Sequence, residues 1–221
     1  MARLQGDKTE LHYEMKTLWR GRLHAGAAVV AFILTVIFWQ RQPHSLTWAT
    51  LLLYGTSMTE LYSFSAIFHL GTWRESTYRK MLAMDQAGIF VFIMSTTTVL
   101  LVNLMSGTYL YIAVAGLWLL TLYSIKHVAT IQQAFRWLSP LLCVILGSPA
   151  IIVLPILLPR ISLAGAGLII GSALSYGGAA YIYARCQPDL FPGVFGYHEL
   201  FHLLTILGAA ATTAVVWIWI M

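Results

Sequence analysis

The sequence predicts an all-α integral membrane protein: a bundle of seven transmembrane helices with a cytoplasmic N-terminus and the C-terminus outside. Of its 221 residues, 59% are hydrophobic and only 10% are charged. That composition is too apolar for a soluble domain of this size, so lipid must be the surrounding solvent. The basic residues, in addition, gather at alternate ends of long apolar runs, which is typical of chains that cross a membrane repeatedly.

The apolar runs supply the individual elements. A spanning helix needs about 20 mostly apolar residues, and the chain offers runs at 23–40, 46–70, 84–105, 109–125, 135–158, 161–184 and 197–221. Short polar connections separate these runs, so residues 23–221 form one seven-helix transmembrane domain. Residues 1–22 are polar and carry five basic side chains. We expect them to form a cytoplasmic or interfacial N-terminal segment, either as a helix in the headgroup layer or as a disordered tail, and not a cleaved signal.

Orientation follows from the distribution of Lys and Arg, which are enriched in cytoplasmic loops. With seven spans, eleven of the basic residues fall on the side of the N-terminus, and only Arg41 and Arg160 fall on the other. The same basic residues lie at span ends, where anionic headgroups explain them better than nucleic acid does. We therefore expect no nucleic-acid partner. Cys143 and Cys186 lack metal-binding or disulfide-framework spacing, which predicts two reduced thiols.

Two spans carry residues that shape their backbone. The fifth is interrupted by prolines, each of which removes a helical hydrogen bond and predicts a kink or a break: Pro140, Pro149 and Pro155. The sixth carries small residues every four positions, a stripe that predicts close approach of another helix: Gly167, Gly171, Ser175 and Ala179.

A metal site is predicted where three spans meet at the cytoplasmic side. His198 and His202 are four residues apart, about 40° around and about 6 Å along a helix, so both imidazoles project from one face. The predicted topology places His69, Ser65 and Asp85 at the same membrane depth. Alone, each has a simpler explanation: an interfacial hydrogen bond for a histidine, a helix cap for Asp85, a bond to a backbone carbonyl for Ser65. Together, they favour a shared site.

The donor set indicates zinc. Ionisable groups below the headgroups are costly unless they are paired or coordinate a metal, and three imidazoles plus a water match an open catalytic zinc site. Iron or manganese would usually recruit more carboxylates. We therefore predict Zn²⁺ on His69, His198 and His202. Asp85 and Ser65 are the candidate catalytic residues.

Other polar residues have weaker interpretations. Glu60 lies nine residues before His69, which places it on the opposite side of the helix and about 13 Å away along the axis, so it should miss the metal and pair with a neighbouring helix. His24 could support the site, but ordinary interface anchoring is the simpler interpretation. His198-Glu199-Leu200-Phe201-His202 also matches the His-Glu-x-x-His signature of metalloproteases, in which Glu199 would be the general base. No downstream ligand follows it.

Three blocks of the sequence resemble a known family. They are Ser65-Ala-Ile-Phe-His69, Met84-Asp85-Gln-Ala-Gly-Ile89 and Gly196-Tyr-His-Glu-Leu-Phe-His202, and they are similar to the signature blocks of the hemolysin III family, bacterial relatives of the progestin and adipoQ (adiponectin) receptors. The resemblance implies a zinc ion near the cytoplasmic face on the three histidines, with a water between the zinc and Asp85 and with Ser65 adjacent. It also implies a multi-pass protein of the bacterial inner membrane. Many bacterial members have an Asn-Ser-x-Thr-His-like block at the start of span one, where this chain has Gly21-Arg-Leu-His24.

The functional hypothesis is a zinc-dependent hydrolase of amide- or ester-linked lipid, because the wider group includes ceramidases. Its partner would be a membrane lipid, as substrate or ligand. The alternatives are a non-enzymatic receptor or regulator of membrane state with structural zinc, an intramembrane metalloprotease, and a hemolysin-type lytic protein, for which the chain lacks a continuous charged lumen. The sequence leaves open the substrate, the oligomeric state and the roles of Glu60, Glu199 and His24.

Overall fold

The fold is all-helical, as predicted. A computed structural model describes residues 16–41, 43–134 and 138–221, and of residues 128–140 only the backbone, where it is described at all. The helices are α1 (Arg22–Trp39), α2 (Leu46–Leu70), α3 (Glu75–Leu104), α4 (Thr108–Ala134), α5 (Leu138–Ile152), α6 (Leu154–Arg185) and α7 (Tyr197–Trp219).

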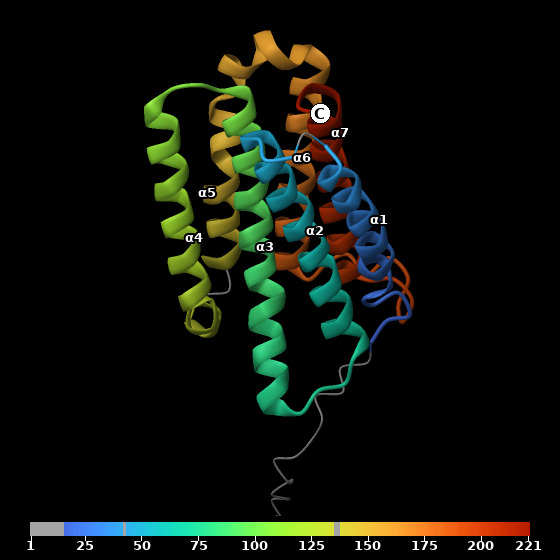
Figure 1. Cartoon of the computed structure of the whole chain (residues 1–221). Helices are drawn as coiled ribbons and strands as arrows, with labels where there is room; N and C mark the ends of the chain where they lie inside the picture. Colours follow the sequence, from blue (N-terminus) through green and yellow to red (C-terminus); the bar gives the residue numbers. More distant parts are fainter. Residues whose placement is uncertain (1–15, 42, 135–137) are drawn as a thin grey trace, which may run out of the picture.

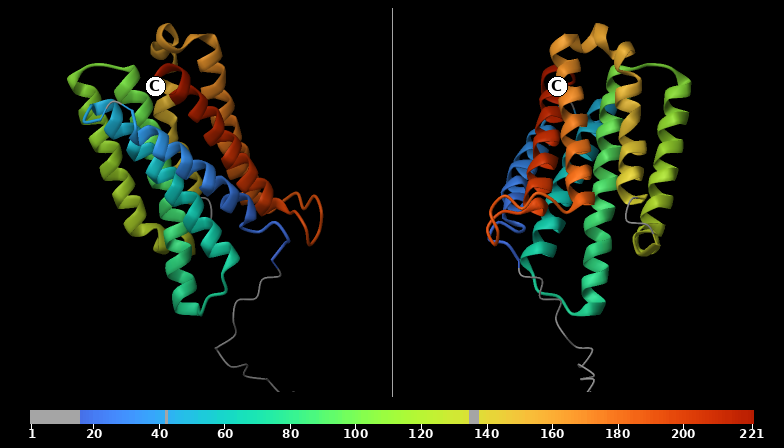
Figure 2. Two further views of the ribbon diagram at one scale, coloured as in Figure 1. Left: turned by 45° about the vertical axis from the view of Figure 1, so that its right-hand side comes forward. Right: turned by 180° about the vertical axis from the view of Figure 1, so that it is seen from behind.

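The helices form an antiparallel bundle in which each runs opposite to the one before it (Figure 1). Six of them pack in a ring, in the order α1, α2, α3, α5, α6, α7 and back to α1, while α4 lies outside the ring against α3 and α5. We call the end where α2 finishes and α3 and α7 begin the histidine end; it faces down in Figure 1. The C-terminus lies at the opposite end from the first described residues, in agreement with an odd number of passes (Figures 1 and 2).

Five of the helices are long and apolar enough to cross a membrane: α1, α3, α4, α6 and α7. Together with the overall composition, they indicate an integral membrane protein. The helix α2 has 25 residues, yet it is not among the five, and α5 has 15 residues. Full spans at these two positions, like the cytoplasmic placement of the N-terminus, stay predictions.

The polarity of α2 follows from its place in the ring between α1 and α3. Its buried residues include Tyr54, Ser57, Ser65 and His69, which face protein and not lipid. A helix that contacts neighbours on two sides needs fewer apolar residues than one surrounded by lipid. Glu60, in contrast, lies on the exposed side of α2 and has no ion pair with the described residues. The expectation that it pairs with a neighbouring helix is not met within this part of the chain.

The helix boundaries differ most from the apolar runs at the end of α4, which continues to Ala134, nine residues beyond its run, and at the start of α3. The helix α3 begins at Glu75, nine residues before the predicted start, so it projects beyond its neighbours at the histidine end (Figure 1). Charged residues can continue a helix outside the apolar layer, and Arg79 stabilises this extension by an ion pair to Glu75 one turn back, at 2.7 Å. Asp85 therefore lies well inside α3, and its interpretation as a helix cap is wrong.

The predicted break within span five is present, between Ile152 and Leu154. Pro149 lies in α5, which ends at Ile152, and Pro155 lies in the first turn of α6. A second break follows at Ser162, where φ is 60° and ψ is 174° inside α6. Residues 154–161 thus form a separate helical piece that crosses the end opposite the histidine end (Figures 1 and 2).

Helix α6 packs closely on α7, but not through the predicted stripe. A Cβ on Gly167 or on Gly171 would have open space around it, so these two positions face no neighbouring helix. Ala179 is the stripe residue that is fully buried. The close approach occurs instead at Gly208 of α7, where a Cβ would lie 2.8 Å from the ring of Tyr176.

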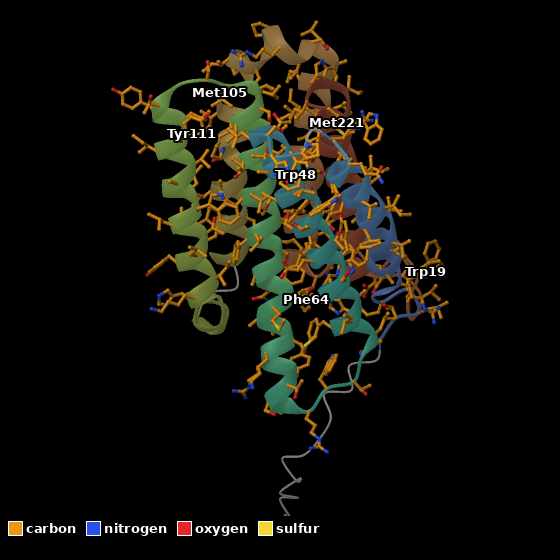
Figure 3. The ribbon with its side chains drawn as sticks, in the orientation of Figure 1. Trp19, Trp48, Phe64, Met105, Tyr111 and Met221 are labelled. Atoms are coloured by element: carbon orange, nitrogen blue, oxygen red, sulfur yellow. The ribbon has the colours of Figure 1, made fainter. Side chains whose placement is uncertain are left out.

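Aromatic residues mark both ends of the bundle. Trp19 lies at the histidine end, whereas Met105, Tyr111 and Met221 lie at the other end, with Trp48 nearer to it (Figure 3). Trp19 and Tyr111 are both exposed. Exposed Trp and Tyr at the two ends of an apolar bundle are typical of the two membrane interfaces.

Candidate metal centre

Three histidines from two helices converge at the histidine end. His69 belongs to the last turn of α2, and His198 and His202 belong to the first two turns of α7. Their ligand atoms all lie within 4.8 Å of one another, and the centroids of the three rings are 4.6 to 5.0 Å apart. Because His69 and His202 are buried and His198 is half-buried, the cluster can enclose a metal ion.

The distances fit a tetrahedral metal with imidazole ligands. Nε2 of His69 and Nε2 of His198 are 3.2 Å apart. Two nitrogens bound to one zinc at about 2.0–2.1 Å with a tetrahedral angle are about 3.3 Å apart. Three protein nitrogens leave the fourth position for water or substrate, which is the arrangement of catalytic zinc sites. The residues present therefore fit the predicted ion.

Local features of the chain hold these helix ends in place. The helix α2 ends at Leu70, and the Trp73 indole Nε1 donates to the carbonyl of Phe68 at 2.9 Å, closing the turn after His69. The helix α7 begins at Tyr197, whose backbone N–H donates to Asp189 at 3.0 Å. These contacts satisfy backbone groups that a helix end leaves without partners.

Asp85 lies next to the cluster, as predicted. Its Oδ2 is 3.7 Å from Nε2 of His69, and its side chain is 15% exposed. The Ser65 hydroxyl, one turn before His69 on α2, lies beside the same carboxyl group. A carboxylate this close to an imidazole cluster can orient a water or accept its proton.

His24 is a part of the site that the sequence raised as an alternative but did not favour. Its ring stacks on that of His202, with centroids 3.8 Å apart and an interplanar angle of 9°. It is 3% exposed, and its Nε2 lies 3.3 Å from the Thr205 hydroxyl. The expectation of ordinary interface anchoring for His24 is therefore wrong: this side chain supports a predicted metal ligand. Its distance from the other histidines in the sequence gave no spacing signal.

Glu199 is held by donors from the segment before α1. The Thr17 hydroxyl donates to its Oε1 at 2.5 Å and the Arg20 guanidinium Nε at 2.7 Å, while the Gly196 N–H donates to its Oε2 at 2.8 Å. Glu199 is fully buried. A carboxylate with both oxygens occupied by structural donors is poorly placed to act as the general base of a metalloprotease.

We call residues 16–21 the strap, because they bind the loop before α7 to the start of α1. The N–H groups of Leu18 and Trp19 donate to the carbonyls of Gly193 and Val194 at 3.1 and 3.2 Å. The expected interfacial helix is not present in residues 16–21; the earlier part of the predicted segment lies outside the described residues. Gly21 ends the strap with a φ of 77°, and a Cβ there would lie 3.0 Å from Cβ of His69. Glycine fits both the conformation and the contact.

A cavity of about 950 Å³ extends from the histidines into the middle of the ring. Both His202 and Thr212 line it, so it follows α7 for about 15 Å. Its walls beyond the histidines are mainly apolar and come from α2, α3, α5 and α6, for instance Leu61, Ile89, Phe92, Leu100, Val144 and Ile169. This volume lies within the range of small-molecule binding sites.

The chain matches the haemolysin-III-related family over residues 12–213, which is most of its length. The chain belongs to this family. No solved structure shows detectable similarity to it.

The match begins before the strap and ends at residue 213 in α7, so it includes the three histidines, Ser65 and Asp85. All five predicted site residues are brought together at one end of the bundle. The structure adds His24 and the strap residues Thr17 and Arg20. Glu60 does not line the cavity, in line with the prediction that it misses the metal.

Proposed function

We propose that this haemolysin-III-related protein is a zinc-dependent hydrolase of amide- or ester-linked membrane lipids. The observation that carries the proposal is the cavity. It joins three metal-ligating histidines and a carboxylate to an apolar chamber inside a helix ring. A purely structural zinc site is closed by four protein ligands and needs no chamber beside it.

Zinc, when bound, lowers the pKa of a coordinated water to about 7 and polarises a carbonyl oxygen. His69, His198 and His202 would hold the ion. Asp85, 3.7 Å from His69, is placed to orient the attacking water and to accept its proton. Ser65 can donate a hydrogen bond to the oxygen on which negative charge develops. The apolar walls would receive the acyl chain and exclude water around it.

The Asp85→Asn variant tests the proposal. Asparagine retains the shape of the side chain but cannot accept the proton, so we expect hydrolysis of a lipid amide to fall at least about 100-fold. Zinc content should stay close to that of the native protein, since the three histidines are unchanged. The measurement is release of fatty acid from short-chain lipid amides and esters by detergent-purified protein, with elemental mass spectrometry on the same samples.

Two outcomes would contradict this function. Full activity of Asp85→Asn would show that Asp85 is not the proton acceptor. Stoichiometric zinc without turnover of any amide or ester lipid would favour the alternative of a receptor or regulator of membrane state. Glu199→Gln serves as the control for the metalloprotease alternative, which requires that carboxylate.

A further inference from the structure

The histidine end of the cavity carries two cations that the proposed hydrolysis does not use, one of which, Arg20, is also paired with Glu199. Besides the histidines, three charged residues line the cavity: Lys16, Arg20 and Asp85. Both cations belong to the strap. The exposed residue Thr72 lines the same end, so this end of the cavity reaches the surface.

Arg20 has hydrogen-bonding capacity that the described part of the chain does not fill. Its side chain is 14% exposed, and its Nε donates to Glu199 at 2.7 Å. The described residues supply no acceptor for its two terminal amino groups. A guanidinium carries five N–H donors, and a mostly buried cation is costly when they lack acceptors. Because Arg20 lines the cavity, an occupant of the cavity can supply them.

Lys16 adds a second cation, next to the end of α2 that carries His69. Its ammonium donates to the carbonyl of Gly71, two residues beyond His69. Both cations interact electrostatically with His69, and Arg20 interacts with His198 and His202 as well. An anion placed between Arg20 and Lys16 would therefore lie beside the metal centre.

We propose that this end of the cavity binds an anionic group of the lipid, a phosphate or a carboxylate, between Arg20 and Lys16. The terminal amino groups of an arginine match two oxygens of such an anion, whereas a neutral alcohol headgroup offers no equivalent. The inference rests on the proposed function and narrows its substrate class: the hydrolysed lipid carries an anionic group close to the bond that is cleaved. Free phosphate has the same chemistry, so the experiment separates the two sources.

Binding, and not turnover, tests this assignment. The detergent-purified full chain is titrated with dihexanoylglycerol phosphate, with dihexanoylglycerol and with inorganic phosphate, and thermal stabilisation is followed by tryptophan fluorescence. We expect the phosphorylated lipid to produce the same thermal stabilisation at a concentration at least about 10-fold lower than the neutral lipid. Equal potency of the two lipids would overturn the proposal. Stabilisation by inorganic phosphate at the same concentration as the phosphorylated lipid would overturn its assignment to a lipid headgroup.

Single substitutions test which residues produce the preference for the phosphorylated lipid. Arg20→Gln and Lys16→Gln should each remove most of the preference for the phosphorylated lipid. Arg22→Gln, the same change of charge at an exposed residue outside the cavity, should retain it. Thr17→Val removes one donor to Glu199 without a change of charge. If Thr17→Val abolished the preference as fully as Arg20→Gln, the effect would come from a loosened strap, and the proposal would be wrong.

A final variant tests whether the two cations or the metal ion bind the anionic group. In His198→Ala/His202→Ala, which lacks two of the proposed zinc ligands, the preference for the phosphorylated lipid should persist. Its disappearance there would mean that zinc holds the anion and would overturn the roles of Arg20 and Lys16. Since no step of the test needs hydrolysis, a chain that binds the phosphorylated lipid but cleaves no lipid would contradict the proposed function alone.

Discussion

Single residues around the metal centre are positioned by contacts that reach across the bundle. Glu199 is the best example, because it lies between two of the clustered histidines in the sequence and yet receives three hydrogen bonds from the strap and from Gly196. Its role is to fix the start of α7 and so the direction of both imidazoles. We therefore expect it to be a positioning residue and not a proton acceptor.

Replacing Glu199 should therefore lower the stability of the fold more than the rate of hydrolysis. Glu199→Gln leaves the Arg20 cation buried without its counter-charge, a change that typically costs about 3–5 kcal/mol. We expect a melting temperature several degrees lower, with hydrolysis per folded, zinc-loaded molecule within a few-fold of the native rate. Glu75→Gln, which breaks the exposed pair with Arg79, is the control and should leave the melting temperature almost unchanged. A stable Glu199→Gln protein without activity would contradict this role.

His24 gives a second prediction at this scale. The His24→Ala variant removes the ring stacked on His202, and residues that orient a metal ligand typically contribute about 10- to 100-fold to metal affinity. We expect zinc affinity to fall by about 10-fold in a chelator competition titration. His24→Phe keeps a flat ring for stacking and should restore most of the loss. Unchanged affinity in His24→Ala would show that the stacking does not orient His202.

The site residues that could be predicted are those linked by helical spacing or by a shared depth in the membrane. His198 and His202 follow from their spacing, and His69, Ser65 and Asp85 from the topology. Arg20 and Thr17 could not be predicted this way, because the strap reaches the site through turns and loop contacts that have no periodic signal. The same absence of a local pattern hid the structural partners of Glu199. His24 lies in the first turn of α1 at the predicted depth, but depth alone does not tell a residue that faces the site from one that anchors the helix at the interface.

Helices could be predicted where a run of apolar residues marks them. Polar helix ends and the faces that pack against other helices could not. The start of α3 was missed because its first turns are polar and lie outside the apolar run. The contact face of α6 was misassigned because small residues recur on two of its sides. Packing against α7 uses the side that meets Gly208, while Gly167 and Gly171 face away.

The α6–α7 contact predicts opposite effects for two glycine substitutions. In Gly208→Ala the new Cβ would lie 2.8 Å from the Tyr176 ring, and overpacking of this kind costs about 1–3 kcal/mol. In Gly171→Ala the new methyl has open space, and alanine is the better helix former. Thermal unfolding in one detergent should show a lower melting temperature for Gly208→Ala and an unchanged or higher one for Gly171→Ala. Equal melting temperatures would contradict the close contact at Gly208.

At the scale of the molecule, the ring of six helices explains why polar residues can lie inside an apolar protein. The histidines, Asp85 and Ser65 line a cavity that the ring encloses, while the outer surface of α1, α4 and α6 is mainly apolar. The helix α2 completes the ring between α1 and α3, and its polar side faces the site. Buried ionisable groups of this kind are retained in membrane proteins for function.

The central claim is that the three histidines bind a metal ion, and metal content tests it most directly. Elemental mass spectrometry of the full chain, purified in detergent without chelators, would be compared with that of His198→Ala/His202→Ala. We predict close to one zinc per chain in the native protein and almost none in the variant. A native protein without zinc or any other transition metal, or a variant with the same metal content, would contradict the account.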